Sequence, residues 1–148
     1  MISNAYANKI LNVITGVSGS ISQANYVYLG LCVSEPNPST GAVNSEPTAP
    51  SYKRRLVGGA LSYQDKAFGS ADDGIITNDK EIQFNTARES WGEGSSKLMY
   101  WFLSETTSGV ATMWGEINDG NGIEIAANTV PTFYEGELKA SIDVALSE

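Results

Sequence analysis

Histidine is absent from the 148-residue sequence, and cysteine occurs once. Without histidine the chain has neither Ser-His-Asp nor Cys-His catalysis, and it lacks the commonest side chain that binds transition metals. The single thiol, Cys32, has no partner for an internal disulfide and lies in the apolar segment 26–33, which favours an inert core residue. Neither the Walker nor the dinucleotide-binding glycine pattern occurs. We therefore expect no catalytic residue, no metal site and no cofactor.

Positive charge is also scarce, with 9 Lys and Arg residues against 17 Asp and Glu residues and a net charge of −8. An acidic surface repels phosphate, so we expect binding neither to nucleic acid nor to an anionic membrane. No apolar run approaches the roughly 20 residues that a membrane-spanning helix needs. The first residues, Met1, Ile2 and Ser3, lack the stages of a secretory signal, so we expect synthesis in a cytoplasm. Protein and sugar remain as partners.

The sequence has one local exception to its acidic character, the cluster Lys53, Arg54 and Arg55. Three basic residues are too few to indicate a nucleic-acid interface. The cluster is more typical of a charged edge strand, because charge on an edge prevents unwanted strand pairing. We also predict that these three residues form an interface with an acidic neighbour.

The length and composition predict one domain over residues 1–148, with an N-terminal helix and linker over 1–19. Apolar residues recur with helical spacing at the start of the chain, at Tyr6, Ile10, Val13, Ile14 and Val17. Ser3 or Asn4 can cap the start of this helix, and Gly16 or Gly19 can end it. We expect about four turns.

The rest of the chain reads as short strands separated by turns. The segment 26–33 is apolar on both faces and is predicted to be a central strand, and 35–51 holds four of the five prolines and is predicted to be a long surface loop. Further strands are predicted at 52–57, 82–85, 97–103, 111–117, 123–125 and 138–144. This pattern predicts an all-β fold, an antiparallel β-sandwich of the jelly-roll or immunoglobulin-like kind, with one N-terminal α-helix.

The segments 99–103 and 111–115 contain the largest side chains of the chain and are predicted to form a hairpin. We expect Trp101 and Trp114 to lie in the core and to pair across the two strands.

Acidic residues are numerous enough that some pair always falls at glycosidase spacing, as Glu116 and Asp119 do, so this spacing alone does not indicate an enzyme. The segment 119–122 begins like a calcium-binding loop, but Ile123 stands where another oxygen ligand is needed. We predict ordinary turns there and at Asp72 and Asp73.

Taken in order, short phrases spread over nearly the whole chain resemble a family of small virion proteins of tailed phages. Proteins of this family are commonly labelled tail-fibre proteins and are sometimes placed among capsid decorations. The phrases that carry the resemblance are at 7–12, 27–31, 46–47, 52–54, 82–84, 90–92, 98–103, 108–109, 113–115 and 135–138. The segment 48–51 departs from the pattern, because a glycine-rich run often stands there. The resemblance implies a β-sandwich on the particle exterior without catalytic residues.

These observations lead to a non-enzymatic structural protein on the exterior of a tailed-phage particle, of the tail-fibre or capsid-decoration type. We expect it to act by docking on other virion proteins and by self-association as a homo-oligomer, with a trimer as one candidate. The alternative is a carbohydrate- or receptor-binding adhesion module in which Trp91 or Tyr134 stacks on a sugar of a host glycan. For either aromatic residue, packing in the core is the competing interpretation.

Overall fold

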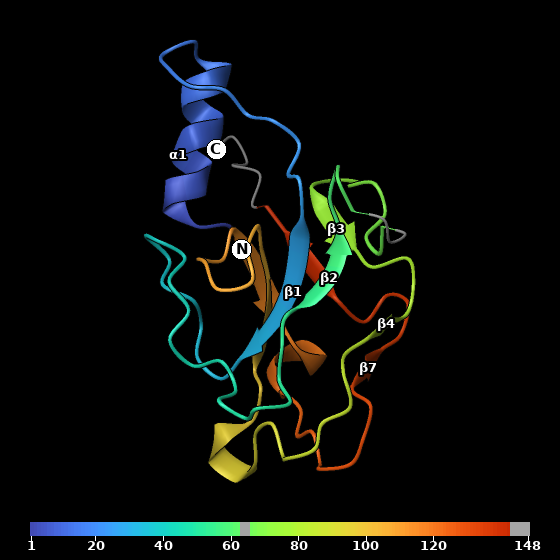
Figure 1. Ribbon diagram of the computed structural model, residues 1–148. Coiled ribbons are helices and arrows are strands. Elements are labelled where there is room, and N and C mark those ends of the chain that lie inside the picture. Colours follow the sequence, from blue (N-terminus) through green and yellow to red (C-terminus); the bar gives the residue numbers. More distant parts are fainter. Residues whose placement is uncertain (63–65, 143–148) are drawn as a thin grey trace.

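The computed structural model describes residues 1–62 and 66–142, which form one α-helix, eight short strands and two 3-10 turns (Figure 1). The elements are, in chain order, α1 Asn4–Ile14, β1 Val27–Cys32, β2 Arg55–Gly58, β3 Ile75–Thr77, β4 Ile82–Gln83, η1 Gly94–Ser96, β5 Tyr100–Ser104, β6 Met113–Glu116, η2 Asn118–Gly120, β7 Thr132–Phe133 and β8 Lys139–Ser141.

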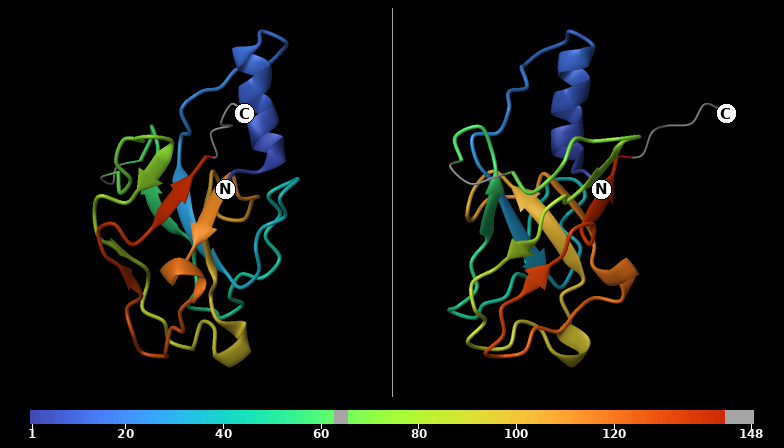
Figure 2. Two further views of the ribbon diagram at one scale, coloured as in Figure 1. Left: turned by 180° about the vertical axis from the view of Figure 1, so that it is seen from behind. Right: turned by 90° about the vertical axis from the view of Figure 1, so that its right-hand side faces the viewer.

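The main sheet has four strands in the order β2-β1-β5-β6, and every neighbouring pair is antiparallel. β1 lies between β2 and β5, so the prediction of a central strand at 26–33 is confirmed. β2 and β6 are the two edges of this sheet. Two smaller antiparallel pairs, β3-β8 and β4-β7, complete the strands, and β8 crosses close to β6 (Figure 2).

The all-β, sandwich-like architecture with one N-terminal helix is thus confirmed. Two strands, β3 and β7, were not predicted. The predicted strand at 123–125 is wrong, because Ile123 makes only an isolated bridge with Leu98. The last predicted strand corresponds to β8, and its final residues 143 and 144 lie outside the described residues.

Apolar side chains fill both faces of the main sheet. One face carries the larger core, in which Leu29, Leu31 and Trp101 pack against residues of the smaller sheets. On the other face, Cys32 and Phe102 belong to a second cluster that the loop at 33–49 covers, and Val43 of this loop packs against it. The predicted surface loop therefore also closes a core.

The two tryptophans of the hairpin are both buried, as predicted, but they do not pair with each other. In the register of β5 and β6, Trp101 lies opposite Gly115, and Trp114 lies opposite Phe102. Because successive side chains of a strand point to opposite faces, this offset of one residue places the two indoles on opposite faces of the sheet. Trp101 stacks on Phe68 instead, with ring centroids 5.7 Å apart.

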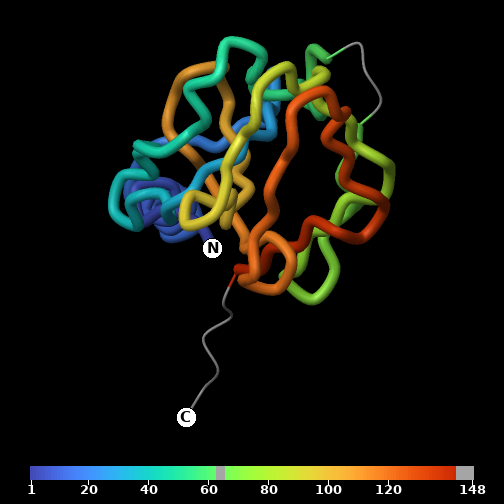
Figure 3. Tube along the Cα trace, turned by 90° about the horizontal axis from the view of Figure 1, so that it is seen from below, coloured from blue at the N-terminus to red at the C-terminus, as the bar shows by residue number. Residues whose placement is uncertain are grey.

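The predicted N-terminal helix is present, and Ser3 caps it by accepting a hydrogen bond from the Tyr6 N–H at 3.2 Å. α1 projects from one end of the sheets (Figures 1 and 2), and a view along the long axis shows it nearly end-on beside the 33–49 loop (Figure 3). No residue of α1 is buried. Within residues 1–62 and 66–142, no helix has the length and apolarity that crossing a membrane requires.

Candidate functional site

The three residues of the basic cluster at 53–55 differ in their exposure to solvent. The side chain of Arg54 is 3% exposed, whereas Lys53 is exposed and Arg55 is half-buried. Side chains alternate in direction along an extended chain, so neighbouring basic residues reach different surroundings. The structure thus removes Arg54 from the predicted surface interface.

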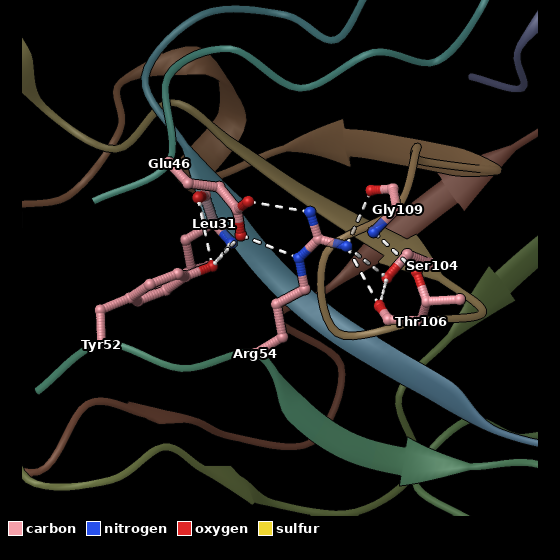
Figure 4. Close-up of polar contacts among 7 residues, drawn as sticks. All are labelled: Leu31, Glu46, Tyr52, Arg54, Ser104, Thr106 and Gly109. Atoms are coloured by element: carbon pink, nitrogen blue, oxygen red, sulfur yellow. Dashed lines mark hydrogen bonds and ion pairs between the residues drawn. The ribbon is translucent and has the colours of Figure 1, made fainter. Parts of the chain in front are cut away.

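The Arg54 guanidinium lies between the long loop and the turn that joins β5 to β6 (Figure 4). On the loop side, Nε and Nη2 of Arg54 donate to the two carboxylate oxygens of Glu46, at 2.9 and 2.8 Å. On the turn side, Nη1 donates to the Ser104 hydroxyl at 2.9 Å and to the carbonyls of Thr106 and Gly109 at 3.1 and 2.9 Å. Two-pronged pairing of arginine with carboxylate is the strongest common geometry for such a pair.

The guanidinium of Arg54 also lies over the aromatic ring of Phe102. Its central carbon lies 4.8 Å from the centroid of the Phe102 ring, within the range of a cation–π contact. The Phe102 ring in turn lies against Gly30, where a Cβ atom would come within 2.2 Å of the ring. Only glycine allows the ring, and hence Arg54, to approach the sheet this closely.

Two ionisable groups beside Arg54 are held in their neutral forms. Burial, followed by the charge of Glu46, raises the pKa of the Cys32 thiol to about 12. Burial also raises the pKa of Tyr52, whose hydroxyl donates to Glu46 at 2.8 Å. A thiol with a raised pKa forms little thiolate near neutral pH, so Cys32 is a poor nucleophile. The contacts of Arg54 therefore join the loop at 33–49 to the sheet and to the β5–β6 turn.

The two candidate sugar-stacking residues differ in their access to solvent. Trp91 is 1% exposed, and its indole N–H donates to the Ser51 hydroxyl at 3.1 Å, so its ring belongs to the core. Tyr134 is 59% exposed. Of the five predicted interface residues, Lys53, Arg55 and Tyr134 remain at the surface, and their role as an interface stays a prediction.

A cavity of about 910 Å³ lies along the outer edge of β6, between that strand and β8. Its lining includes the aromatic residues Tyr100 and Trp114 and the carboxylates of Glu35 and Glu116. Burial, then the charges of Glu35 and Glu116, raises the pKa of the Tyr100 hydroxyl, so both carboxylates act on that hydroxyl. No local sequence pattern predicts this groove, because its residues come from segments that are far apart in the chain.

The acidic segments predicted to be turns are turns. Asp72 and Ile75 exchange two backbone hydrogen bonds of 2.9 and 2.8 Å, and Asp119 lies in η2 with a φ of 52°. Across the part of the chain that the structure describes, no three His, Cys, Asp or Glu residues are grouped so that they could hold a metal ion.

Comparison with protein families gives one match that covers most of the chain. The family described as podophage GP4 fiber I protein gp80 matches residues 1–141. A search of curated proteins found no match.

Proposed function

Because the chain belongs to the family of podophage GP4 fiber I protein gp80, we propose that it is a non-enzymatic structural protein on the exterior of a tailed-phage particle. It is made in the host cytoplasm, docks on other virion proteins and self-associates. The fibre family favours a tail-fibre role over capsid decoration. The observation that best supports self-association is the uncovered apolar face of α1.

This apolar face is exposed to solvent at Leu11 and Ile14, while Ile10 and Val13 are half-buried. Leu11 and Ile14 of α1 are 56% and 74% exposed, and Val17, just after the helix, is 72% exposed. The only charged residue of α1 is Lys9. At 100° per residue Lys9 lies about 140–160° around the helix from Leu11 and Ile14, on the opposite face.

A helix of this length gains most of its stability from packing. α1 has 11 residues and no buried residue, and an isolated helix shorter than about 12–15 residues is marginal in water. An uncharged face of this kind is complementary to another copy of itself, and a closed ring of copies brings the same face of every copy to the symmetry axis. We therefore propose a cyclic homo-oligomer that packs through α1, with a trimer as the first candidate.

Sedimentation velocity of the purified chain tests this proposal. The wild type should sediment as a multiple of its 15.8 kDa mass. The double variant Leu11→Gln/Ile14→Gln keeps helix-favouring side chains but removes the apolar face, and should shift the protein to the monomer. The matched control Asn8→Gln/Asn12→Gln changes the exposed polar face of α1 and should leave the mass unchanged.

Two results would contradict the proposal: a wild-type chain that remains monomeric at high micromolar concentration, or an oligomer that the Leu11→Gln/Ile14→Gln change leaves intact. Circular dichroism of the variants checks that the helix and the sheets still form, so that a loss of association is not a loss of folding.

A carbohydrate-binding adhesion role is the second candidate, and the exposed ring of Tyr134 is the observation that favours it. Exposed aromatic rings stack on pyranose faces. A glycan array probed with the wild type and with Tyr134→Ala decides this point. Binding that is lost in the variant supports the role, and absence of binding by the wild type dismisses it.

A further inference from the structure

The two edges of the four-stranded sheet carry opposite charge. At the β2 edge, the backbone of Arg55 pairs with Leu29 of β1, but the side chains of the exposed Lys53 and the half-buried Arg55 make no hydrogen bond or ion pair with the part of the chain that the structure describes. At the β6 edge, the side chain of Glu116 is exposed and makes no ion pair within residues 1–62 and 66–142. The groove beside it is lined by the carboxylates of Glu35, Glu116, Asp119 and Glu137 and by two cations, Lys139 and the N-terminal amine of Met1, so its balance of charge is acidic. The chain is strongly acidic overall, so an outward-facing basic edge is a specific local feature.

The outer side of the β6 backbone is bridged by residues 1–3 as far as Trp114 and is open beyond it. Trp114 exchanges hydrogen bonds with Met1 across the side of β6 that faces away from β5, at 2.9 Å and 2.7 Å. Alternate residues of a strand direct their N–H and C=O groups to the same edge, so those of Glu116 also point outward, into the groove. Within the described residues, Ile2 makes an isolated bridge with Met113 on this edge, and no strand pairs with Glu116 there.

The groove beside β6 is large enough for side chains from another molecule. Its volume of about 910 Å³ falls in the range of protein binding sites, about 300–1,000 Å³. The half-buried ring of Tyr100 offers apolar surface for the methylene stem of a lysine or arginine, while Glu35 and Glu116 offer acceptors for its charged end.

We propose that the two edges bind each other between copies of this chain, so that Lys53 and Arg55 beside β2 of one copy enter the acidic groove beside β6 of the next. This inference rests on the proposed self-association and adds to it a second, polar contact. The contact is head-to-tail, so it links copies into a ring when the rotation between them closes.

A second copy is the occupant that the charges favour. Within one chain, the two edges lie on opposite sides of the sheet, about 14 Å apart at the usual strand spacing, with β1 and β5 between them. Two β6 edges would bring like carboxylates together, and two β2 edges would bring like cations together. Only the unlike pairing of β2 with β6 joins opposite charges.

Charge reversal with complementation tests the contact. Glu116→Lys reverses the groove, and Lys53→Glu/Arg55→Glu reverses the basic edge. Each variant alone should associate at least about tenfold more weakly than the wild type at low salt. Mixing the two should restore association between unlike variants, because the contacts between them then join opposite charges, although a closed ring of three would keep one contact between like variants. Sedimentation velocity in about 0.05 M and about 0.5 M salt is the measurement, since screening should weaken the wild-type contact.

Glu105→Lys is the matched control for Glu116→Lys. It makes the same change of net charge on an exposed residue of the β5–β6 turn that does not line the groove, and should behave as the wild type. If Arg55→Glu lowers the melting temperature, the single variant Lys53→Glu replaces the double variant as the reversal of the basic edge, because Lys53 is exposed.

Unchanged association in the reversed variants, failure of the mixture to recover, or equal effects of Glu105→Lys and Glu116→Lys would overturn the edge contact. The edge contact would also be overturned if the groove bound a basic peptide while the chain showed no salt-sensitive self-association, because the occupant of the groove would then be another molecule. The proposed α1 contact is tested separately and is contradicted when Leu11→Gln/Ile14→Gln has no effect on association. The two contacts can be told apart because an apolar contact, unlike an ion pair, does not weaken with salt.

Discussion

Removing the charge of Arg54 should cost a large part of the folding free energy. Arg54→Met keeps an apolar stem over the Phe102 ring but removes both guanidinium donors to the Glu46 carboxylate, which then keeps only the Tyr52 hydroxyl, and removes the Arg54 donor to the Gly109 carbonyl. Breaking a buried ion pair from one side typically costs about 3–5 kcal/mol. Because the Glu46 side chain is 24% exposed and can be partly hydrated, we expect the lower end, about 3 kcal/mol.

Domains are stable by about 5–15 kcal/mol, so the variant should still fold but with a clearly reduced margin. For a chain of 148 residues, about 2.1 cal/mol/K of unfolding entropy per residue converts 3 kcal/mol into a fall of roughly 10 °C in Tm. Urea unfolding followed by tryptophan fluorescence measures the free energy of unfolding directly. Lys53→Met, an exposed neighbour, is the control and should change it by no more than about 0.5 kcal/mol.

A double-mutant cycle separates the pair from the rest of the site. Glu46→Gln should also destabilise the fold, but in the Arg54→Met background it should cost at least about 1 kcal/mol less, because the two side chains act on each other. Additive effects of the two changes, or an Arg54→Met loss below about 0.5 kcal/mol, would refute the conclusion that this ion pair joins the loop to the sheet.

Three further changes test the packing around the sheet. Gly30→Ala should lower the free energy of unfolding by about 1–3 kcal/mol, because its Cβ would overlap the Phe102 ring, and urea unfolding checks this. Trp91→Phe keeps an aromatic ring but loses the hydrogen bond to Ser51, and should cost about 1–3 kcal/mol in the same assay without the loss of any binding activity. The folded-state pKa of Cys32 is raised to about 12, so the folded protein keeps the proton that the unfolded chain releases, and stability should fall as pH rises above about 9 toward that value. Thermal melts of Cys32→Ala across this range should show a smaller decline, and equal declines would contradict the buried neutral thiol.

The sequence predicted the elements whose signals are local. Periodicity and the Ser3 cap located α1, and a run of β-branched and aromatic residues located β1. β3 and β7 escaped prediction because they have three and two residues, and strands so short are defined by their partners and not by their own composition. The pairing of the two tryptophans was missed because register depends on the turn between the strands, and residue spacing alone does not fix it.

The interface prediction failed at Arg54 for a similar reason. Composition marks three adjacent basic residues as one patch, yet alternation along an extended chain already implies that the middle one faces away from its neighbours. Its partner Glu46 lies in the predicted loop, eight residues earlier in the chain, and no periodicity links the two. Lys53 and Arg55 needed no partner within the chain to remain at the surface.

An electron cryomicroscopy map of the intact phage particle would test most directly whether this chain is a self-associating structural protein on the particle exterior. We predict density for this fold on the particle exterior, in several copies around a symmetry axis, with the apolar faces of α1 in contact. Particles whose map and protein content lack the chain, or copies that touch through surfaces remote from both α1 and the sheet edges, would contradict the account.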